Sequence, residues 1–221
     1  TGTTYTWTVS ANANVTGQSD VTTGASSISQ ILTNPTNTAE TVTYAVTPTS
    51  GTCVGASFSV TVTVNPSPSV ISQTSTICSG GNYSFTPTNG GGNIIPVGGP
   101  GPGTHYTWSA PIVNGLTGMS SAVGYAAGFV SGTLVNTTNA PITVVYTVTP
   151  NYDNTPVYCA GSPFTVTITV NPKPVIAAQT ATACSGSAFT VAPTTGGTDI
   201  VPTGTTYTWT VSANANVTGQ S

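Results

Sequence analysis

The stretch CAGSPFTVTITVNPKP at residues 159–174 alternates apolar residues with threonine, and it closely matches CVGASFSVTVTVNPSP at residues 53–68. The apolar positions of the first stretch are Phe164, Val166, Ile168 and Val170. A period of two residues is typical of a half-buried β-strand. Threonine suits the outer face, because it is β-branched and its hydroxyl is solvated without carrying charge. Both stretches therefore predict a strand that runs into a short proline junction.

Longer repeats surround these strands. Residues 1–19 recur letter for letter at 203–221, and Tyr-Thr-Trp begins at Tyr5, Tyr106 and Tyr207. Such recurrence indicates tandem domains. We expect three parts, which are the C-terminal part of one repeat (1–66), a complete repeat (67–171) and the N-terminal part of the next (172–221). We also expect residues 1–221 to be a window on a longer chain built from 202-residue super-repeats.

The composition excludes several classes of function. Lys and Arg together number 1, Asp and Glu number 4, and only 2% of residues are charged, against about 25% in an average soluble domain. Such a chain lacks the basic surface that binds nucleic acid. No apolar run reaches the ~20 residues of a membrane-spanning helix. We expect no enzyme and no cofactor, because the acids, bases and cations of catalysis are nearly missing.

The strand pattern predicts an all-β fold. Between residues 67 and 171, strands are expected near 69–77, 82–87, 104–109, 120–125, 129–135, 142–149 and 163–171. Seven short strands separated by Gly, Pro and Asn turns favour an immunoglobulin-like β-sandwich. The expected core aromatics are Trp7, Tyr44, Trp108, Tyr146 and Trp209. The junctions are expected to be stiffened by Pro66, Pro68, Pro172 and Pro174, so the tandem sandwiches form an extended rod.

The order CSG…YTW…VTY-x-VTP…C-x-G…F-x-VTVTVNP covers the whole chain. It resembles the PKD-like, immunoglobulin-like tandem repeats of giant secreted surface proteins of gliding Bacteroidota. The resemblance implies stalks or fibres of adhesins, exported by the type IX route and displayed at the cell surface. It implies no catalytic residues. The chain also lacks the dense acidic loops of calcium-clamped arrays, so no metal is expected.

Four cysteines, Cys53, Cys78, Cys159 and Cys184, are disulfide candidates, because regular cysteines in an extracellular-looking chain usually pair. Zinc-ligand spacing is absent. Two pairings stay open. One is a staple across a junction, from the first-loop cysteine of one domain to the last-loop cysteine of the following one. The other is a Cys78–Cys159 bridge, which conflicts with the five strands predicted between these residues, since bridged Cα atoms lie within ~7 Å.

The remaining polar candidates are interpreted as structural. His105 is expected at a strand edge, and the four acids (Asp20, Glu40, Asp153 and Asp199) are expected to be scattered, with Asp153 in a solvated turn. Lys173 lacks the repeated partners of an isopeptide bond. Tyr152 and Tyr158 are expected to be exposed and available for a ligand or a neighbouring chain.

The leading hypothesis is a structural repeat of a long extracellular bacterial fibre or adhesin stalk, serving surface attachment and possibly gliding. The expected partners are neighbouring repeats along the chain and, laterally, further copies in a filament. The alternative is a carbohydrate- or protein-binding accessory module that spaces a secreted enzyme from the cell.

Overall fold

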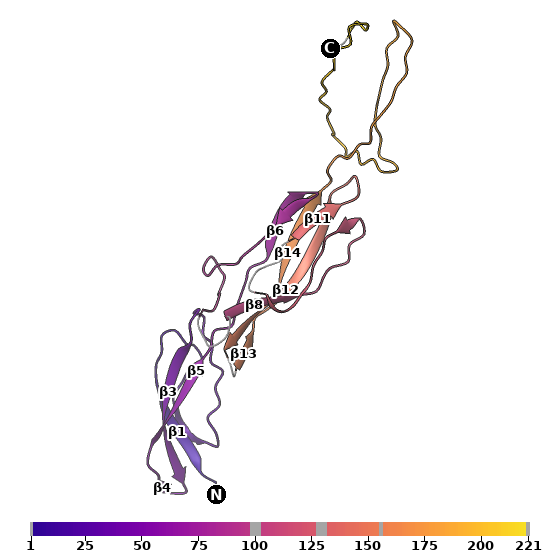
Figure 1. Cartoon of the computed structure of the whole chain (residues 1–221). Helices are drawn as coiled ribbons and strands as arrows, with labels where there is room; N and C mark the ends of the chain where they lie inside the picture. Colours follow the sequence, from indigo (N-terminus) through magenta and orange to yellow (C-terminus); the bar gives the residue numbers. More distant parts are fainter. Residues whose placement is uncertain (1, 98–102, 127–131, 155–156, 220–221) are drawn as a thin grey trace.

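The computed structural model describes residues 2–97, 103–126, 132–154 and 157–219. These residues form an elongated rod with the N- and C-termini at opposite ends (Figure 1). Three parts follow one another: an N-terminal body (residues 2–66), a central sandwich (residues 69–171) and a C-terminal segment (residues 172–219). The described residues form strands, turns and loops without a helix. Hence none of them belongs to a helix that could cross a membrane.

The central sandwich has two layers. The larger sheet follows the order β10-β8-β12-β14-β6, and β13 pairs with β12. The smaller sheet has the order β7-β11-β9. Their bounds are β6 (Gln73–Cys78), β7 (Gly81–Tyr83), β8 (Gly103–Trp108), β9 (Leu116–Thr117), β10 (Ala122–Ala126), β11 (Gly132–Asn136), β12 (Ile142–Asn154), β13 (Val157–Ala160) and β14 (Phe164–Asn171). The pairing of β6 with β14 is parallel, whereas the other pairs are antiparallel.

The core lies between these two layers. Alternate residues of β12 and β14 point inward and are fully buried: Val144, Val148, Val166, Ile168 and Val170 are each 0% exposed. Tyr83, Leu116 and Leu134 close the core from the smaller sheet. The rings of Tyr106 and Phe164 meet edge to face, with centroids 6.4 Å apart, a favourable aromatic geometry. The predicted alternation of apolar and threonine residues therefore produces the core directly.

A buried asparagine ties the smaller sheet to the larger one. Asn136 is 2% exposed, and its Nδ2 donates to the carbonyl oxygens of Ala140 and Val170, both at 2.8 Å. Asn34 makes the same pair of bonds in the N-terminal body, to Thr38 and Val64, also at 2.8 Å. Because a buried amide must be hydrogen-bonded, this residue holds the position of the loop that follows it.

The N-terminal body repeats one sheet of this sandwich. Its strands are β1 (Thr4–Ser10), β2 (Val21–Ala25), β3 (Glu40–Ser50), β4 (Cys53–Val54) and β5 (Phe58–Val64). Trp7 lies opposite Val46, and Val46 lies opposite Phe58, just as Trp108, Val148 and Phe164 face one another in the central sandwich. Thus β5 corresponds to β14. Among the described residues, however, nothing pairs with β5 as β6 pairs with β14.

Burial differs accordingly between the two equivalent strands. Phe58 of β5 is 46% exposed, whereas Phe164 of β14 is 4% exposed. The three valines of β5 that follow Phe58 are half-buried, whereas their counterparts on β14 are fully buried. The sequence pattern is the same, so the difference comes from the cover that β6 and β7 provide.

The C-terminal segment contains no strand among its described residues. Two isolated bridges, Val175 with Ile200 and Gly196 with Asp199, give it local order. Most of its side chains are exposed, and it runs as an open loop beyond the central sandwich (Figure 1).

Three expectations of local structure were wrong around residues 150–158. Strand β12 continues to Asn154 and pairs with β13, so this region is a hairpin and not a loop. Tyr152 is consequently 1% exposed and Asp153 is 4% exposed, rather than open to solvent. His105 is 6% exposed, because it lies on β8 opposite Asn151, in the part of β12 that continues into the hairpin. The predicted strand 129–135 begins in residues outside those described, and its described part is β11.

We predict different costs for the same substitution in the two equivalent strands. Val170→Ala removes fully buried methyl groups and should destabilise the central sandwich by about 2 kcal/mol. Val64→Ala, in the half-covered strand, should cost about 1 kcal/mol or less. Amide hydrogen exchange of β12 and β3, read by mass spectrometry, measures the two local stabilities. Equal losses would contradict the burial argument.

We also predict a loss of stability at high pH. Burial raises the pKa of Tyr83 and of Tyr106 to about 12, whereas an unfolded tyrosine ionises near pH 10. The folded state holds both protons more tightly, so this contribution is complete below pH 10 and is lost as the pH rises towards 12. Absorbance of tyrosinate should show at least two groups that resist ionisation, since burial also raises the pKa of Tyr44, Tyr146 and Tyr152. A single step near pH 10 for all 9 tyrosines, with the fold intact, would refute this.

Candidate functional site

The best-defined candidate site is the junction between the N-terminal body and the central sandwich, residues 65–69. Pro66 and Pro68 are both buried, Pro66 almost completely. Proline holds the backbone extended and donates no hydrogen bond, so it suits a connection whose backbone joins no sheet. Both predicted linker prolines therefore lie inside a packed contact.

Two side-chain bonds cross this junction. Asn154 Nδ2, at the end of β12, donates to Asn65 Oδ1 at 2.8 Å. Ser67 Oγ donates to the carbonyl oxygen of Ala160 at 3.1 Å. Both bonds come from the β12–β13 hairpin of the central sandwich and hold the linker in place. The sequence analysis did not predict this hairpin.

A backbone bond joins the opposite side. The amide of Val97 donates to the carbonyl oxygen of Asn37 at 3.0 Å. The same loop is tied to the linker, because Ser69 and Ile94 exchange backbone bonds at 2.9 and 2.8 Å. The N-terminal body is therefore held on two sides, and such bonds restrict bending between the units.

Gly161 allows the closest approach at the junction. A Cβ atom on Gly161 would lie 1.9 Å from the carbonyl oxygen of Pro68 and 2.9 Å from Cγ of Pro150. Since real Cβ atoms do not approach backbone oxygens this closely, any other residue would push the linker away from β13.

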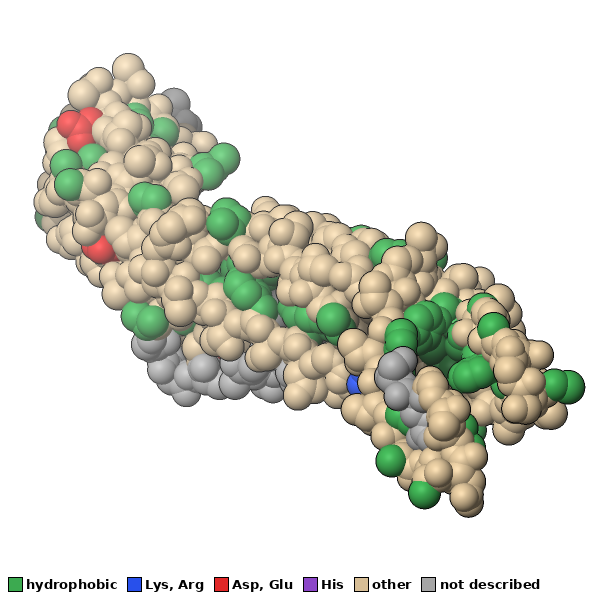
Figure 2. Space-filling model, turned by 90° about the horizontal axis from the view of Figure 1, so that it is seen from above, with side chains coloured by type: hydrophobic (Ala, Val, Ile, Leu, Met, Phe, Trp, Pro, Cys, Tyr) green, Lys and Arg blue, Asp and Glu red, His purple; other side chains and the backbone are tan. Residues whose placement is uncertain are grey.

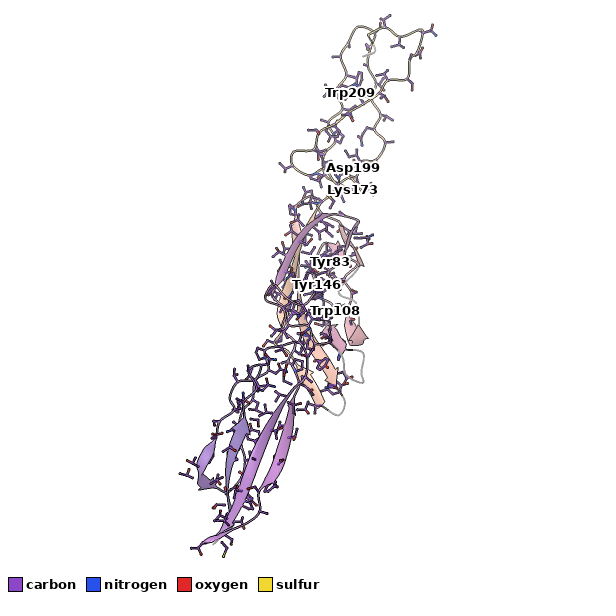
Figure 3. All side chains as sticks on the ribbon, turned by 90° about the vertical axis from the view of Figure 1, so that its left-hand side faces the viewer. Tyr83, Trp108, Tyr146, Lys173, Asp199 and Trp209 are labelled. Carbon is purple, nitrogen blue, oxygen red and sulfur yellow. The ribbon has the colours of Figure 1, made fainter. Side chains whose placement is uncertain are left out.

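The second proline junction, residues 171–175, is open in the described chain. Pro172 is half-buried, and Lys173 and Pro174 are exposed. Thus Pro66 and Pro68 are packed, while Pro172 and Pro174 are not. Figure 3 places Lys173 where the C-terminal segment leaves the central sandwich.

The acidic residues serve mainly as local hydrogen-bond acceptors. Glu40 accepts bonds from the Nδ2 atoms of Asn12 and Asn14 at 3.0 and 2.9 Å. Asp20 accepts from the amide of Val9 at 2.8 Å, and Asp199 accepts from the amide of Ala177 at 2.8 Å. No group of three metal-ligating side chains occurs in the part of the chain that the structure describes.

All four cysteines carry free thiols in this structure. Cys78 lies opposite Asn171 at the end of β14, level with the start of β12 near Ile142 but separated from β12 by β14, whereas Cys159 lies opposite Tyr152 near the other end of β12. The ten residue steps from Ile142 to Tyr152 correspond to about 33 Å of strand, far beyond the reach of a disulfide bridge. Cys159 is half-buried, and this burial raises the pKa of its thiol.

The tryptophans do not form an exposed aromatic platform. Trp7 is 4% exposed, and its Nε1 donates to the carbonyl oxygen of Ser19 at 3.0 Å. Trp108 packs against the central core and donates in the same way to Ser120 at 3.1 Å. Of the other predicted core aromatics, Tyr44 and Tyr146 are both 1% exposed.

Trp209 departs from its predicted place in a core. It is 75% exposed, and Figure 3 shows it on the open C-terminal segment, apart from Tyr83, Tyr146 and Trp108. The reason is that residues around it form no sheet on which the indole could pack.

We predict that Gly161→Ala loosens the junction. The added methyl group must displace the linker at Pro68, so the angle between the two folded parts should spread without loss of either sheet. Small-angle X-ray scattering should show a broader distribution of dimensions, while circular dichroism stays unchanged. Gly196→Ala is the control, because a Cβ there meets nothing within 4 Å. An unchanged scattering curve for Gly161→Ala would contradict the contact.

Comparison with known proteins identifies the family. A family model described as a PKD-like domain matches residues 1–68 and 75–174, and no curated protein matches the chain. Domains of this family are typically extracellular, non-catalytic modules with an immunoglobulin-like fold. The match includes the N-terminal body, the packed junction and the central sandwich, and so the chain belongs to the PKD-like domain family.

Proposed function

We propose that this chain is a structural repeat of a long extracellular fibre or adhesin stalk at a bacterial cell surface. Its repeating unit is the 202-residue super-repeat, and we assign residues 1–66 to the C-terminal part of one immunoglobulin-like repeat, 67–171 to a whole repeat and 172–221 to the N-terminal part of the next. The single observation that carries the proposal is the packed junction at residues 65–69. A binding module needs no fixed angle to its neighbour, whereas a stalk needs one at every step.

The geometry of the unit supports an extended arrangement. The chain enters the central sandwich at one end, through residues 65–69, and leaves it at the other end, through β14 and Pro172 (Figure 1). Each domain therefore advances the chain by its own length, roughly 35–45 Å at ~3.3 Å per strand residue. A series of such domains therefore forms a long chain that bends little at its junctions.

The surface supports the same function. Figure 2 shows a face almost without charged side chains, and the whole chain has a formal net charge of −3. Threonine and serine hydroxyls keep the strands solvated in place of ions. Neighbouring copies can pack side by side without desolvating charges, which is a cost for ionic surfaces.

The test is to join increasing numbers of 202-residue repeats genetically and to image the purified chains by electron microscopy. A stalk predicts beaded rods of constant width whose length grows by an equal step with each repeat. Compact or irregular particles would overturn the proposal. Specific, saturable binding on a glycan array, together with flexible junctions, would favour the accessory-module alternative instead.

We predict that the length of these rods does not depend on salt. The described contacts at the junction are hydrogen bonds and proline packing rather than ion pairs, and salt screens only charges. The length per repeat, measured by scattering, should be the same at low ionic strength and at ~1 M salt, where the Debye length is only about 3 Å. A marked swelling would show that ionic contacts set the spacing.

A further inference from the structure

The central sandwich holds its two cysteines at opposite ends. Cys78 lies opposite Asn171, where the chain leaves the sandwich. Cys159 lies on β13, in the hairpin that contacts the incoming linker at residues 65–69. Cys53 has the equivalent place on β4, at the end of the N-terminal body that faces away from this linker (Figure 1). A domain of this kind therefore carries one cysteine at its exit and one at its entrance.

The hairpin that bears Cys159 is extended towards the linker. In the N-terminal body, β3 ends at Ser50, and this residue pairs with Cys53. In the central sandwich, β12 continues further and pairs with β13 up to Asn154. The extra length brings Asn154 to Asn65, to which its Nδ2 donates at 2.8 Å. The entrance cysteine of the central sandwich is therefore carried by the element that contacts the preceding unit.

The side chain of Cys159 lies on the side of the hairpin that contacts Asn65. Cys159 is directly opposite Tyr152, and directly opposite residues of an antiparallel pair point to the same side of the sheet. Tyr152 and Asn154 are two residues apart in one strand, so their side chains also share a side. The thiol of Cys159 and the amide group of Asn154 that reaches Asn65 are thus on the same side.

The exit cysteine is held beside an asparagine that ends the last strand. In the parallel pair of β6 and β14, Cys78 is level with Asn171. The amide of Ser79 donates to the carbonyl oxygen of Asn171 at 2.8 Å, which fixes this end of β6. Asn65 stands in the same Val-Asn-Pro sequence just after β5, so it is the counterpart of Asn171. The exit cysteine of the N-terminal body therefore belongs beside Asn65.

Cys184 is this exit cysteine in the continuous chain. It stands in the Cys-Ser-Gly sequence at 184–186, which matches Cys-Ser-Gly at 78–80. The following residues, 203–221, repeat residues 1–19, so residues 172–202 come directly before a body of the N-terminal kind. We expect them to complete that body within one chain, and this placement rests on the proposed 202-residue super-repeat.

We propose that Cys184 of one repeat and Cys159 of the following repeat form a disulfide across the packed junction. Cys184 lies one strand spacing, ~4.8 Å, from Asn65 of the following repeat, and Asn65 contacts Asn154 of the hairpin that bears Cys159. Two neighbouring contacts therefore separate the thiols, on the scale of the ~7 Å over which a disulfide joins Cα atoms. The bridge joins consecutive domains of one chain rather than the two ends of one domain.

Formation of this bridge needs an oxidant, for which a small disulfide such as oxidised glutathione is sufficient. The oxidant accepts two electrons and two protons from the two thiols and becomes two reduced glutathiones, while one S–S bond forms between the cysteines. The bridge adds a covalent tie to the hydrogen bonds that Asn154 and Ser67 already make at the junction. Oxidation should therefore restrict bending between the two domains further.

The test uses two 202-residue repeats joined in one chain, with Cys53→Ser and Cys78→Ser in both copies. After treatment with oxidised glutathione, chains of monomeric mass are isolated and digested with pepsin. Mass spectrometry should find the peptide that contains Cys184 joined to the peptide that contains Cys159. Absence of this linked peptide would overturn the proposal.

The same substitution, made in one copy at a time, supplies the matched control. Cys159→Ser in the second copy removes a thiol from the junction that follows Cys184, so the linked peptide should disappear. Cys159→Ser in the first copy leaves that junction intact, so the linked peptide should remain at the level of the parent chain. Equal amounts of linked peptide in the two variants would show that the bridge does not depend on this junction, and the proposal would be wrong.

Electron microscopy of the same two-repeat chain under reducing conditions separates this inference from the proposed function. Extended rods that yield no linked peptide after oxidation would overturn the disulfide and leave the proposed stalk unaffected. Compact particles would overturn the stalk, whether or not the linked peptide is found after oxidation. The two proposals therefore fail separately.

Discussion

A β-strand becomes stable only when its backbone groups find a neighbouring strand, and this constraint decides the state of each part of the chain. In the central sandwich, β14 has a partner on both edges, and its inward side chains are fully buried. In the N-terminal body, the equivalent β5 has one partner, and Phe58 remains half-exposed. In the C-terminal segment, residues 179–184 match β6 at four of six positions, have no neighbouring strand among the described residues and form no strand themselves. Equivalent strand sequences are therefore buried to different extents in the three parts.

The junction at residues 65–69 restricts bending between the N-terminal body and the central sandwich. Buried prolines, side-chain bonds from Asn154 and Ser67, and the close approach at Gly161 hold two folded parts at one angle. None of these contacts involves an ion pair. The threonine-rich surface follows the same principle, because hydroxyls solvate the strands while leaving few charges to repel or to be screened. Reach and stiffness thus come from hydrogen bonds and packing.

Much of this could be predicted from single residues and their spacing. The alternation at 164–170 predicted β14 and its buried face, and the matching Trp and Tyr positions predicted the shared register of the two units. The β12–β13 hairpin was not predicted, because the strand was expected to end at residue 149 and Asp153 to lie in a solvated turn, yet the strand continues through Asn154. Burial of His105 and Tyr152 follows from that hairpin. Likewise, Gly161 gave no signal in the sequence, since its role depends on a linker nearly a hundred residues away.

The sequence by itself determined the all-β fold, the repeat and its phase, because apolar alternation and identical segments are properties of neighbouring residues along the chain. Only the tertiary structure decided which copies of a strand are paired and which are open. Trp7 and Trp209 lie in the same local sequence, yet one is 4% exposed and the other 75%. Their difference arises because β1 has neighbours on both edges, whereas residues 203–219 have none among the described strands. Local sequence specifies the tendency to form a strand, and distant residues supply the hydrogen-bonding partner that makes it one.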